Sequence, residues 1–140
     1  MTRSLTPSAV HAAGVPAQLF GVAAGPAGWI AQLVVNYAVS SHLCFPGDAP
    51  RAGAPPAGEH GVLLTVSLAC LALALSGLWV SISGLRRSRA AVAEGALATA
   101  PGRSRFLAMC GVLSASAFAI AIAFNIPSTL ALRLCWSIPQ

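Results

Sequence analysis

Charged side chains are scarce in this chain. Only 8% of its 140 residues are Asp, Glu, Lys or Arg, whereas 56% are hydrophobic. Soluble domains carry about 25% charged residues, so this chain has too few charges to cover a water-facing surface. The composition therefore excludes an ordinary soluble domain and predicts an integral membrane protein. At roughly 20 residues for each transmembrane helix, the length accommodates three spans and their connections.

Lysine is absent, so all eight basic residues are arginines. The net charge of +5 does not favour nucleic-acid binding, because no aromatic-studded basic surface accompanies it. Five arginines lie beside apolar runs in the second half of the chain: Arg86, Arg87, Arg89, Arg103 and Arg105. Such a block is typical of a topology signal that also contacts lipid headgroups. We therefore expect these arginines to bind anionic headgroups, and we expect no nucleic-acid partner.

Three apolar runs predict an all-α membrane protein, a small bundle of three transmembrane helices at about residues 17–43, 61–85 and 104–134. Residues 1–16 are polar and aperiodic, and we expect them to form a flexible N-terminal segment. A cleaved signal peptide is the alternative, but no compact apolar stretch precedes a small-residue cleavage motif.

The segments between the spans differ in character. The 44–60 loop contains four prolines and three glycines, which are incompatible with a helix or a paired strand. The 86–103 loop is rich in arginine, and residues 136–140 form a short tail. Six of the eight arginines lie in the N-terminal segment and between residues 86 and 105. The positive-inside rule therefore predicts that the N-terminus and the 86–103 loop are cytoplasmic, whereas the 44–60 loop and the tail are periplasmic. This is an N-in, C-out topology in a bacterial inner membrane.

Small residues recur at helical spacing within two spans. In hydrocarbon, small side chains allow helix backbones to approach closely. The second span carries Cys70, Ala74, Gly77, Ser81 and Gly84. The third span carries Cys110, Ser114, Ala117 and Ala121. Two such seams predict a tightly packed bundle, although a chain this rich in alanine and glycine also produces seams by chance.

The first span carries a more polar stripe, formed by Gly25, Trp29, Gln32, Asn36 and Ser40. Its side-chain amides can bond to a neighbouring helix. Three interpretations follow: packing within the bundle, contact with another subunit, or a substrate path. The last is disfavoured because no Asp, Glu, Lys or Arg lies at membrane depth. We predict contacts with partner helices through Trp29, Gln32, Asn36, Ser40, Gly77, Ser81 and Gly84.

Pro127 interrupts the third span and predicts a kink. Proline lacks an N–H, so a carbonyl one turn earlier loses its hydrogen bond. We expect the side-chain amide of Asn125 to satisfy that carbonyl.

The four cysteines fall into two pairs. Cys70 and Cys110 lie within spans and are expected to be small buried apolar residues. Cys44 and Cys135 follow the first and third spans on the same outer, oxidising side, which predicts a disulfide between them. The alternative is a metal site at the outer face, because the pattern His42-x-Cys44 suits copper. Its further candidate ligands are Asp48, Glu59 and His60, and a haem between His42 and His60 is another alternative.

The first span contains GPAGW, QL, NYA and a cysteine, in that order. A Pro-rich loop, a histidine that opens the second span, and an Arg-rich loop follow it. The third span begins with RFLAMCGVLSA, and a late cysteine comes after it. Over roughly residues 21–135 this pattern resembles small three-span bacterial membrane proteins encoded beside haem-copper cytochrome oxidase subunits. The matching positions are Trp29, Tyr37, Cys44 and Cys135. The resemblance implies an accessory role at a respiratory complex.

No motif in the sequence indicates catalysis or a cofactor. The sequence therefore predicts a non-enzymatic accessory or assembly subunit of an inner-membrane complex, of the respiratory type that the resemblance implies. Its partners would be other membrane subunits and the anionic bilayer. Two alternatives remain open: a small homo-oligomeric transporter and a periplasm-facing copper-handling protein.

Overall fold

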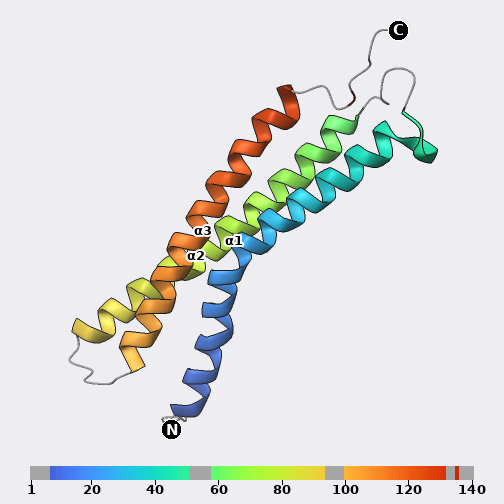
Figure 1. Cartoon of the computed structure of the whole chain (residues 1–140). Coiled ribbons are helices and arrows are strands. Elements are labelled where there is room, and N and C mark those ends of the chain that lie inside the picture. The colour runs from blue at the N-terminus through green and yellow to red at the C-terminus, as the bar shows by residue number, and fades with distance from the viewer. Residues whose placement is uncertain (1–6, 51–57, 94–99, 132–134, 136–140) are drawn as a thin grey trace.

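Three long helices make up the bundle (Figure 1). The computed structural model describes residues 7–50, 58–93, 100–131 and 135. In chain order the elements are α1 (Pro7–Cys44), a short 3-10 helix η1 (Pro46–Asp48), α2 (Glu59–Ala93) and α3 (Ala100–Ala131). Helices α1 and α3 run in the same direction, and α2, which follows α1 and precedes α3 in the chain, runs antiparallel to both (Figure 1). No strand occurs within the described ranges.

Each helix contains an apolar stretch long enough to cross a bilayer. These stretches are Val15–Cys44, His60–Ala90 and Gly102–Leu130. The prediction of an all-α membrane protein with three spanning helices in a small bundle is therefore confirmed. Residues 1–6, the loop residues 51–57 and 94–99, residues 132–134 at the end of the predicted third span, and the tail 136–140 lie outside the described part of the chain.

The helices extend beyond the expected spans. Helix α1 begins at Pro7, so residues 7–16, expected to be loose, are helical. Proline is favoured at the first position of a helix, and the segment PSAVHAAGVP contains three alanines, which have the highest helix propensity. Likewise, α2 continues to Ala93 through the first part of the predicted 86–103 loop.

Helix α1 bends near the middle of the bundle (Figure 1). Its first turns diverge from α2 and α3, whereas Gln18 still donates a hydrogen bond to Ser104 of α3. Pro26 lies within this helix. Its missing N–H leaves the carbonyl of Val22, four residues earlier, without its helical partner. The Ser114 hydroxyl of α3 donates a hydrogen bond to that carbonyl at 3.3 Å. A side chain of α3 thus replaces the backbone bond that proline removes from α1.

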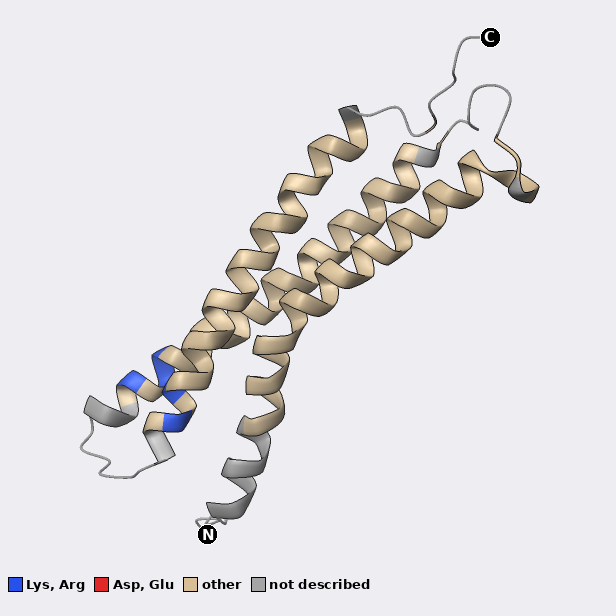
Figure 2. Ribbon diagram, in the orientation of Figure 1, with Lys and Arg blue, Asp and Glu red and all other residues tan. Residues whose placement is uncertain are grey.

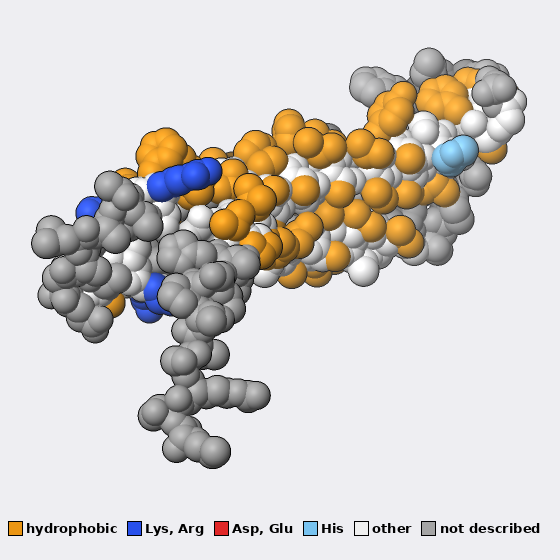
Figure 3. Space-filling view, turned by 90° about the horizontal axis from the view of Figure 1, so that it is seen from below, with side chains coloured by type: hydrophobic (Ala, Val, Ile, Leu, Met, Phe, Trp, Pro, Cys, Tyr) orange, Lys and Arg blue, Asp and Glu red, His pale blue; other side chains and the backbone are white. Residues whose placement is uncertain are grey.

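The outer surface is apolar along most of the bundle. Hydrophobic side chains cover the flank seen in Figure 3, between an arginine-bearing end and an end with a histidine. Large side chains on all three helices are exposed, among them Tyr37, Trp79, Leu113 and Phe124. The described arginines gather at the end where the N-terminus lies, opposite the C-terminus (Figure 2). The molecule therefore has an apolar belt with a basic rim at one end.

Candidate functional site

The central crossing of α1 and α2 is built from residues with almost no side chain. A Cβ atom added at Gly77 would lie 2.7 Å from the Cβ of Ala24, and one added at Gly21 would overlap the Ser81 hydroxyl. A Cβ on Gly28 would lie 3.0 Å from the backbone carbonyl oxygen of Cys70. These helices approach so closely that glycine is required at their contact.

Helix α3 joins the same crossing. A Cβ on Gly25 would lie 2.9 Å from the Cα of Ala115. On α3 itself, a Cβ on Gly111 would overlap the Ser81 hydroxyl, which also lies against Gly21. Ser81 is only 5% exposed. Its side chain therefore occupies the point where all three helices meet.

The seam predicted on α2 is the buried face of that helix. Four of its five predicted members are buried, namely Cys70, Ala74, Gly77 and Ser81. The same spacing continues to Leu63 and Ser67 toward one end and to Ser88 toward the other. Alternating steps of four and three give a repeat of 3.5 residues, which is typical of helices packed at a shallow left-handed crossing.

The seam predicted on the third span is wrong in register. The buried face of α3 consists of Ala108, Gly111, Ala115, Ala119 and Ile122. Ala117 is exposed, and Cys110, Ser114 and Ala121 are only partly buried at the edge of the contact. Small residues occur on both faces, so their spacing alone does not determine which face turns inward.

Three contact glycines, Gly21, Gly28 and Gly111, were not predicted from the sequence. Gly21 and Gly25 form a G-x-x-x-G pattern in an apolar run, which indicates a helix-packing face and was the available signal for Gly21. Gly111 follows the predicted Cys110 by one residue, so the register error on α3 concealed it.

Gln32 lies inside the bundle and has no exposed surface. Its Oε1 accepts a hydrogen bond from Asn125 Nδ2 on α3 at 3.4 Å. Asn125 therefore bonds to a neighbouring helix and not to the carbonyl freed by Pro127, which corrects that expectation. Gln32, Gly77 and Ser81 pack within this chain, which is the first of the three interpretations of the stripe and agrees with the tight bundle that the α2 seam predicts.

The other members of the predicted contact set lie nearer the surface. Trp29 is half-buried and packs on Phe118, with ring centroids 5.5 Å apart and planes inclined at 48°. Asn36 and Ser40 are also partly exposed. A Cβ on Gly84 would meet only the Cβ of Ala108, at 3.8 Å, so the helices are further apart there than at Gly77.

The five predicted headgroup arginines are all exposed: Arg86, Arg87, Arg89, Arg103 and Arg105. They come from the end of α2 and the start of α3 and share the basic rim (Figure 2). Arg87 Nε donates to the Ser83 carbonyl at 3.2 Å, so that guanidinium folds back along its own helix. Their contact with anionic lipid stays a prediction.

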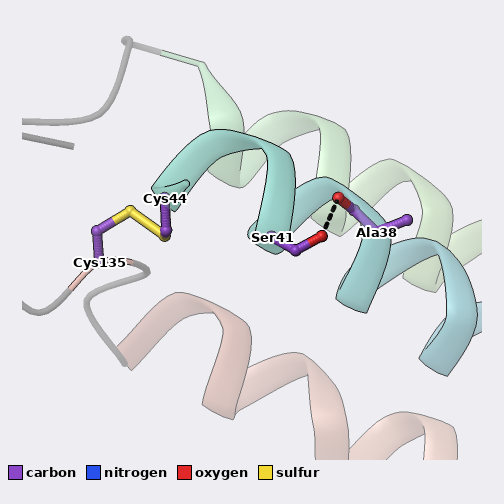
Figure 4. Close-up of a disulfide and its surroundings, with 4 residues drawn as sticks. All are labelled: Ala38, Ser41, Cys44 and Cys135. Atoms are coloured by element: carbon purple, nitrogen blue, oxygen red, sulfur yellow. Dashed lines mark hydrogen bonds between the residues drawn. A yellow bond between two sulfur atoms is a disulfide. The ribbon is translucent and has the colours of Figure 1, made fainter. Parts of the chain in front are cut away.

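The predicted disulfide is confirmed. Cys44, the last residue of α1, is bonded to Cys135, beyond the described end of α3, with their Cα atoms 5.4 Å apart (Figure 4). One turn earlier on α1, the Ser41 hydroxyl donates to the Ala38 carbonyl at 3.0 Å. Cys70 is a buried free thiol as expected, and Cys110 is free but only half-buried.

The disulfide argues against a copper site at the outer face. The ligand that copper requires from cysteine is a thiolate. The Cys44 sulfur is instead bonded to Cys135, so the His42-x-Cys44 pair lacks its sulfur ligand. Within the described residues no group of three or more His, Cys, Asp or Glu side chains could hold a metal ion. The side chains of Asp48 and Glu59 lie outside that description.

Comparison with known proteins adds no relative: no family model, curated protein or solved structure matches this chain.

Proposed function

We propose that this chain is a non-enzymatic accessory or assembly subunit of a bacterial inner-membrane complex, which it contacts through transmembrane helices. The complex is of the respiratory, cytochrome oxidase type that the sequence resemblance implies. The predicted α2 seam and most of the polar stripe of α1 pack inside the bundle. Contact with a partner therefore has to use the outward faces of the helices.

One outward face of α2 carries the proposal. At steps of four, three and four residues, it presents the exposed side chains of Thr65, Ala69, Ala72 and Ser76. Large exposed residues such as Leu68, Leu75 and Trp79 flank it. The first small-residue face of α2 is buried against α1 and α3. A second such face on the outside of α2 lets the backbone of a further helix approach closely. We call this surface the outer α2 face.

The hydroxyl groups on the outer α2 face already have partners. Thr65 Oγ1 donates to the Gly61 carbonyl at 2.8 Å, and Ser76 Oγ donates to the Leu73 carbonyl at 2.7 Å. A helix that packs here therefore leaves no unpaired hydroxyl hydrogen in the interface. These two groups can enter an apolar contact at little cost.

The chemistry of the spans favours contact over transport. No Asp, Glu, Lys or Arg occurs in residues 15–44, 61–85 or 106–130. Ion and proton paths through membrane proteins are generally marked by such residues. Of the polar groups at depth, Ser114 and Asn125 bind neighbouring helices, and others such as Ser67 bond to a carbonyl of their own helix.

The proposal also includes the bilayer as a partner. Five exposed arginines form the rim at one end of the apolar belt. Each basic side chain near an anionic surface contributes about 1 kcal/mol of attraction. These residues anchor the cytoplasmic end in the N-in topology.

Pull-down from native membranes tests the proposal. The full chain, tagged at its C-terminus, is solubilised in mild detergent, and the captured material is examined for protein partners and for a haem spectrum. The variant Ala72→Leu fills the outer α2 face, and Ala123→Leu places the same side chain at an exposed position of α3. We expect Ala72→Leu to weaken retention of the partner by at least about fivefold, equivalent to about 1 kcal/mol, and Ala123→Leu to leave it unchanged.

Each other outcome removes part of the proposal. Recovery of the chain without a membrane partner contradicts the accessory role. A defined partner complex without haem retains that role but excludes the oxidase type. Equal retention by both variants shows that the outer α2 face is not the contact.

A further inference from the structure

Gln32 bonds to one side-chain amide and lies one helical turn from another. Gln32 and Asn36 come from α1, and Asn125 comes from α3. Asn125 Nδ2 donates to Gln32 Oε1, which connects the two helices. Two buried atoms in this group have no hydrogen-bond partner: Gln32 Nε2 and Asn36 Oδ1. Gln32 is fully buried, so lipid and bulk water do not reach it.

This group lies far from both membrane surfaces. Gln32 precedes Cys44, the end of α1, by twelve residues, a distance of roughly 18 Å along a helix. The hydrocarbon core is about 30 Å thick, so Gln32 lies near its middle. At that depth a polar atom without a partner is costly, because no solvent replaces the missing bond.

The two unpartnered atoms have complementary chemistry. Gln32 Nε2 is a donor and Asn36 Oδ1 is an acceptor. They belong to residues four apart on one helix, so their side chains lie one turn apart on the same face. Neither atom has a hydrogen-bond partner, and a small molecule that both accepts and donates has the chemistry to pair with both. Water is the smallest molecule that does both, and two polar groups meet the minimum that a buried water requires.

We propose that Gln32 and Asn36 bind a single buried water near the middle of the membrane. The water accepts a hydrogen bond from Gln32 Nε2 and donates one to Asn36 Oδ1. It completes a continuous chain of hydrogen bonds from Asn125 on α3, through Gln32, to Asn36 on α1. Because water donates and accepts, the site also works if all three amide planes are turned over. The site does not depend on any partner protein and so goes beyond the proposed function.

Side-chain NMR of the full, disulfide-bonded chain in nanodiscs tests this proposal. The amide groups of Gln and Asn are labelled with nitrogen-15, and the Gln32 signal is assigned as the one that Gln32→Leu removes. In the wild type we expect a nuclear Overhauser effect between the Gln32 NH2 protons and water. Its sign should be the one that a long-lived bound water gives. Asn36→Leu removes the acceptor and should abolish the contact. Ser116→Ala, at a hydroxyl that bonds its own helix, should leave it intact.

The wild-type spectrum decides the proposal even if Asn36→Leu does not fold, which the loss of the Cys44–Cys135 bond would reveal. A Gln32 signal without water contact overturns the proposal. So does a direct contact between the two amides with no water signal. A water contact that persists in folded Asn36→Leu removes Asn36 from the site and equally overturns the bridge.

Unfolding measurements supply a second readout. Asn36→Leu should lower the folding equilibrium constant by about threefold, if the bond within α1 is as strong as the average hydrogen bond between membrane helices. In a Gln32→Leu background the same change should have no such effect, because the water has already lost its donor. Equal effects in both backgrounds contradict a bridge between the two side chains.

Discussion

At the scale of single residues, glycine sets the distance between helices, because it carries only a hydrogen atom in place of a side chain. Gly77 and Gly84 occupy the same face of α2, two turns apart. At Gly77 a Cβ would lie 2.7 Å from the Ala24 Cβ, whereas at Gly84 the nearest atom would be the Ala108 Cβ at 3.8 Å. The first position is at a tight contact between α1 and α2, and the second has room for a methyl group.

Substitution by alanine should therefore have opposite effects at these two glycines. Gly77→Ala forces α1 and α2 apart, and we expect it to lower the free energy of unfolding by about 1–3 kcal/mol, as overpacking does. Gly84→Ala gains helix propensity without a clash, and we expect it to raise that free energy by about 0.5–1 kcal/mol.

Equilibrium unfolding in mixed detergent micelles, followed by circular dichroism, measures both changes. Gly84→Ala is the matched control, because it makes the same substitution on the same helix face. Equal destabilisation by the two variants would mean that helix contact at Gly77 is no closer than at Gly84.

At the scale of the element, α1 depends on a neighbour to tolerate a proline. Pro26 leaves the Val22 carbonyl without its backbone bond, and Ser114 of α3 donates to it. Nothing in the α1 sequence identifies that donor, which lies 92 residues away. The bend of α1 is therefore stabilised from α3.

Ser114→Ala should destabilise the bundle by about 0.6 kcal/mol, the average for hydrogen bonds between membrane helices, and by no more than about 1.7 kcal/mol, the largest value. In a Pro26→Ala background the effect should vanish, because residue 26 then supplies the N–H itself. Unfolding of the four proteins of this double-mutant cycle gives the coupling between the two positions.

Ser116→Ala is the control for this cycle, since the Ser116 hydroxyl donates to the Leu113 carbonyl of its own helix. We expect that variant to change stability by less than about 0.5 kcal/mol. An effect of Ser114→Ala that is the same with and without Pro26 would show that the hydroxyl does not replace the proline's missing bond.

At the scale of the whole molecule, the two ends of the bundle differ in chemistry. One end carries the basic rim, and the other carries the Cys44–Cys135 disulfide. Disulfides form in oxidising compartments, and arginines gather on the cytoplasmic side of membranes. Both features favour the same N-in, C-out orientation from different physical causes.

Mass-tag alkylation tests the disulfide in the native membrane. Denatured but unreduced protein should label at two cysteines, Cys70 and Cys110, and reduced protein should label at four. Cys135→Ser should then label at three without reduction. Labelling of all four cysteines in unreduced wild type would exclude the bond.

Loss of that bond should also destabilise the bundle. For a closed loop of 91 residues, the chain-entropy estimate is about 4–5 kcal/mol for a free chain. Membrane insertion already restricts the unfolded chain, so we expect Cys135→Ser to cost less than that value. Ser41→Ala, near the bond but outside it, is the control in the same unfolding assay.

Reporter fusions test the orientation. Fusions after residue 90 should report the cytoplasm, and fusions after residue 52 or 140 should report the periplasm, because arginines on one side of the spans set the topology. Replacing the arginines at the end of α2 by glutamine should increase the fraction of reversed molecules. The opposite pattern in the wild type would place the disulfide on the reducing side and contradict both arguments.

The sequence by itself determined the features that depend on one segment of chain. Apolar length and the scarcity of charge predict three spans, and the longer of the two small-residue stripes on α2 is the one that is buried. The position of Cys44 and Cys135 at the ends of parallel spans predicts their bond. Each of these follows from the periodicity of a helix or from counting residues across a bilayer.

Only the tertiary structure decided the features that depend on which helix faces which. Both faces of α3 carry small residues, so the choice of Gly111 over Cys110 comes from contact with Ser81. The sequence does not determine which residue hydrogen-bonds to Gln32. The parallel alignment of α1 and α3 places Gln32 beside Asn125, which donates to it. Periodicity within a helix specifies which residues share a face, whereas burial of that face depends on the position and axial shift of the neighbouring helices.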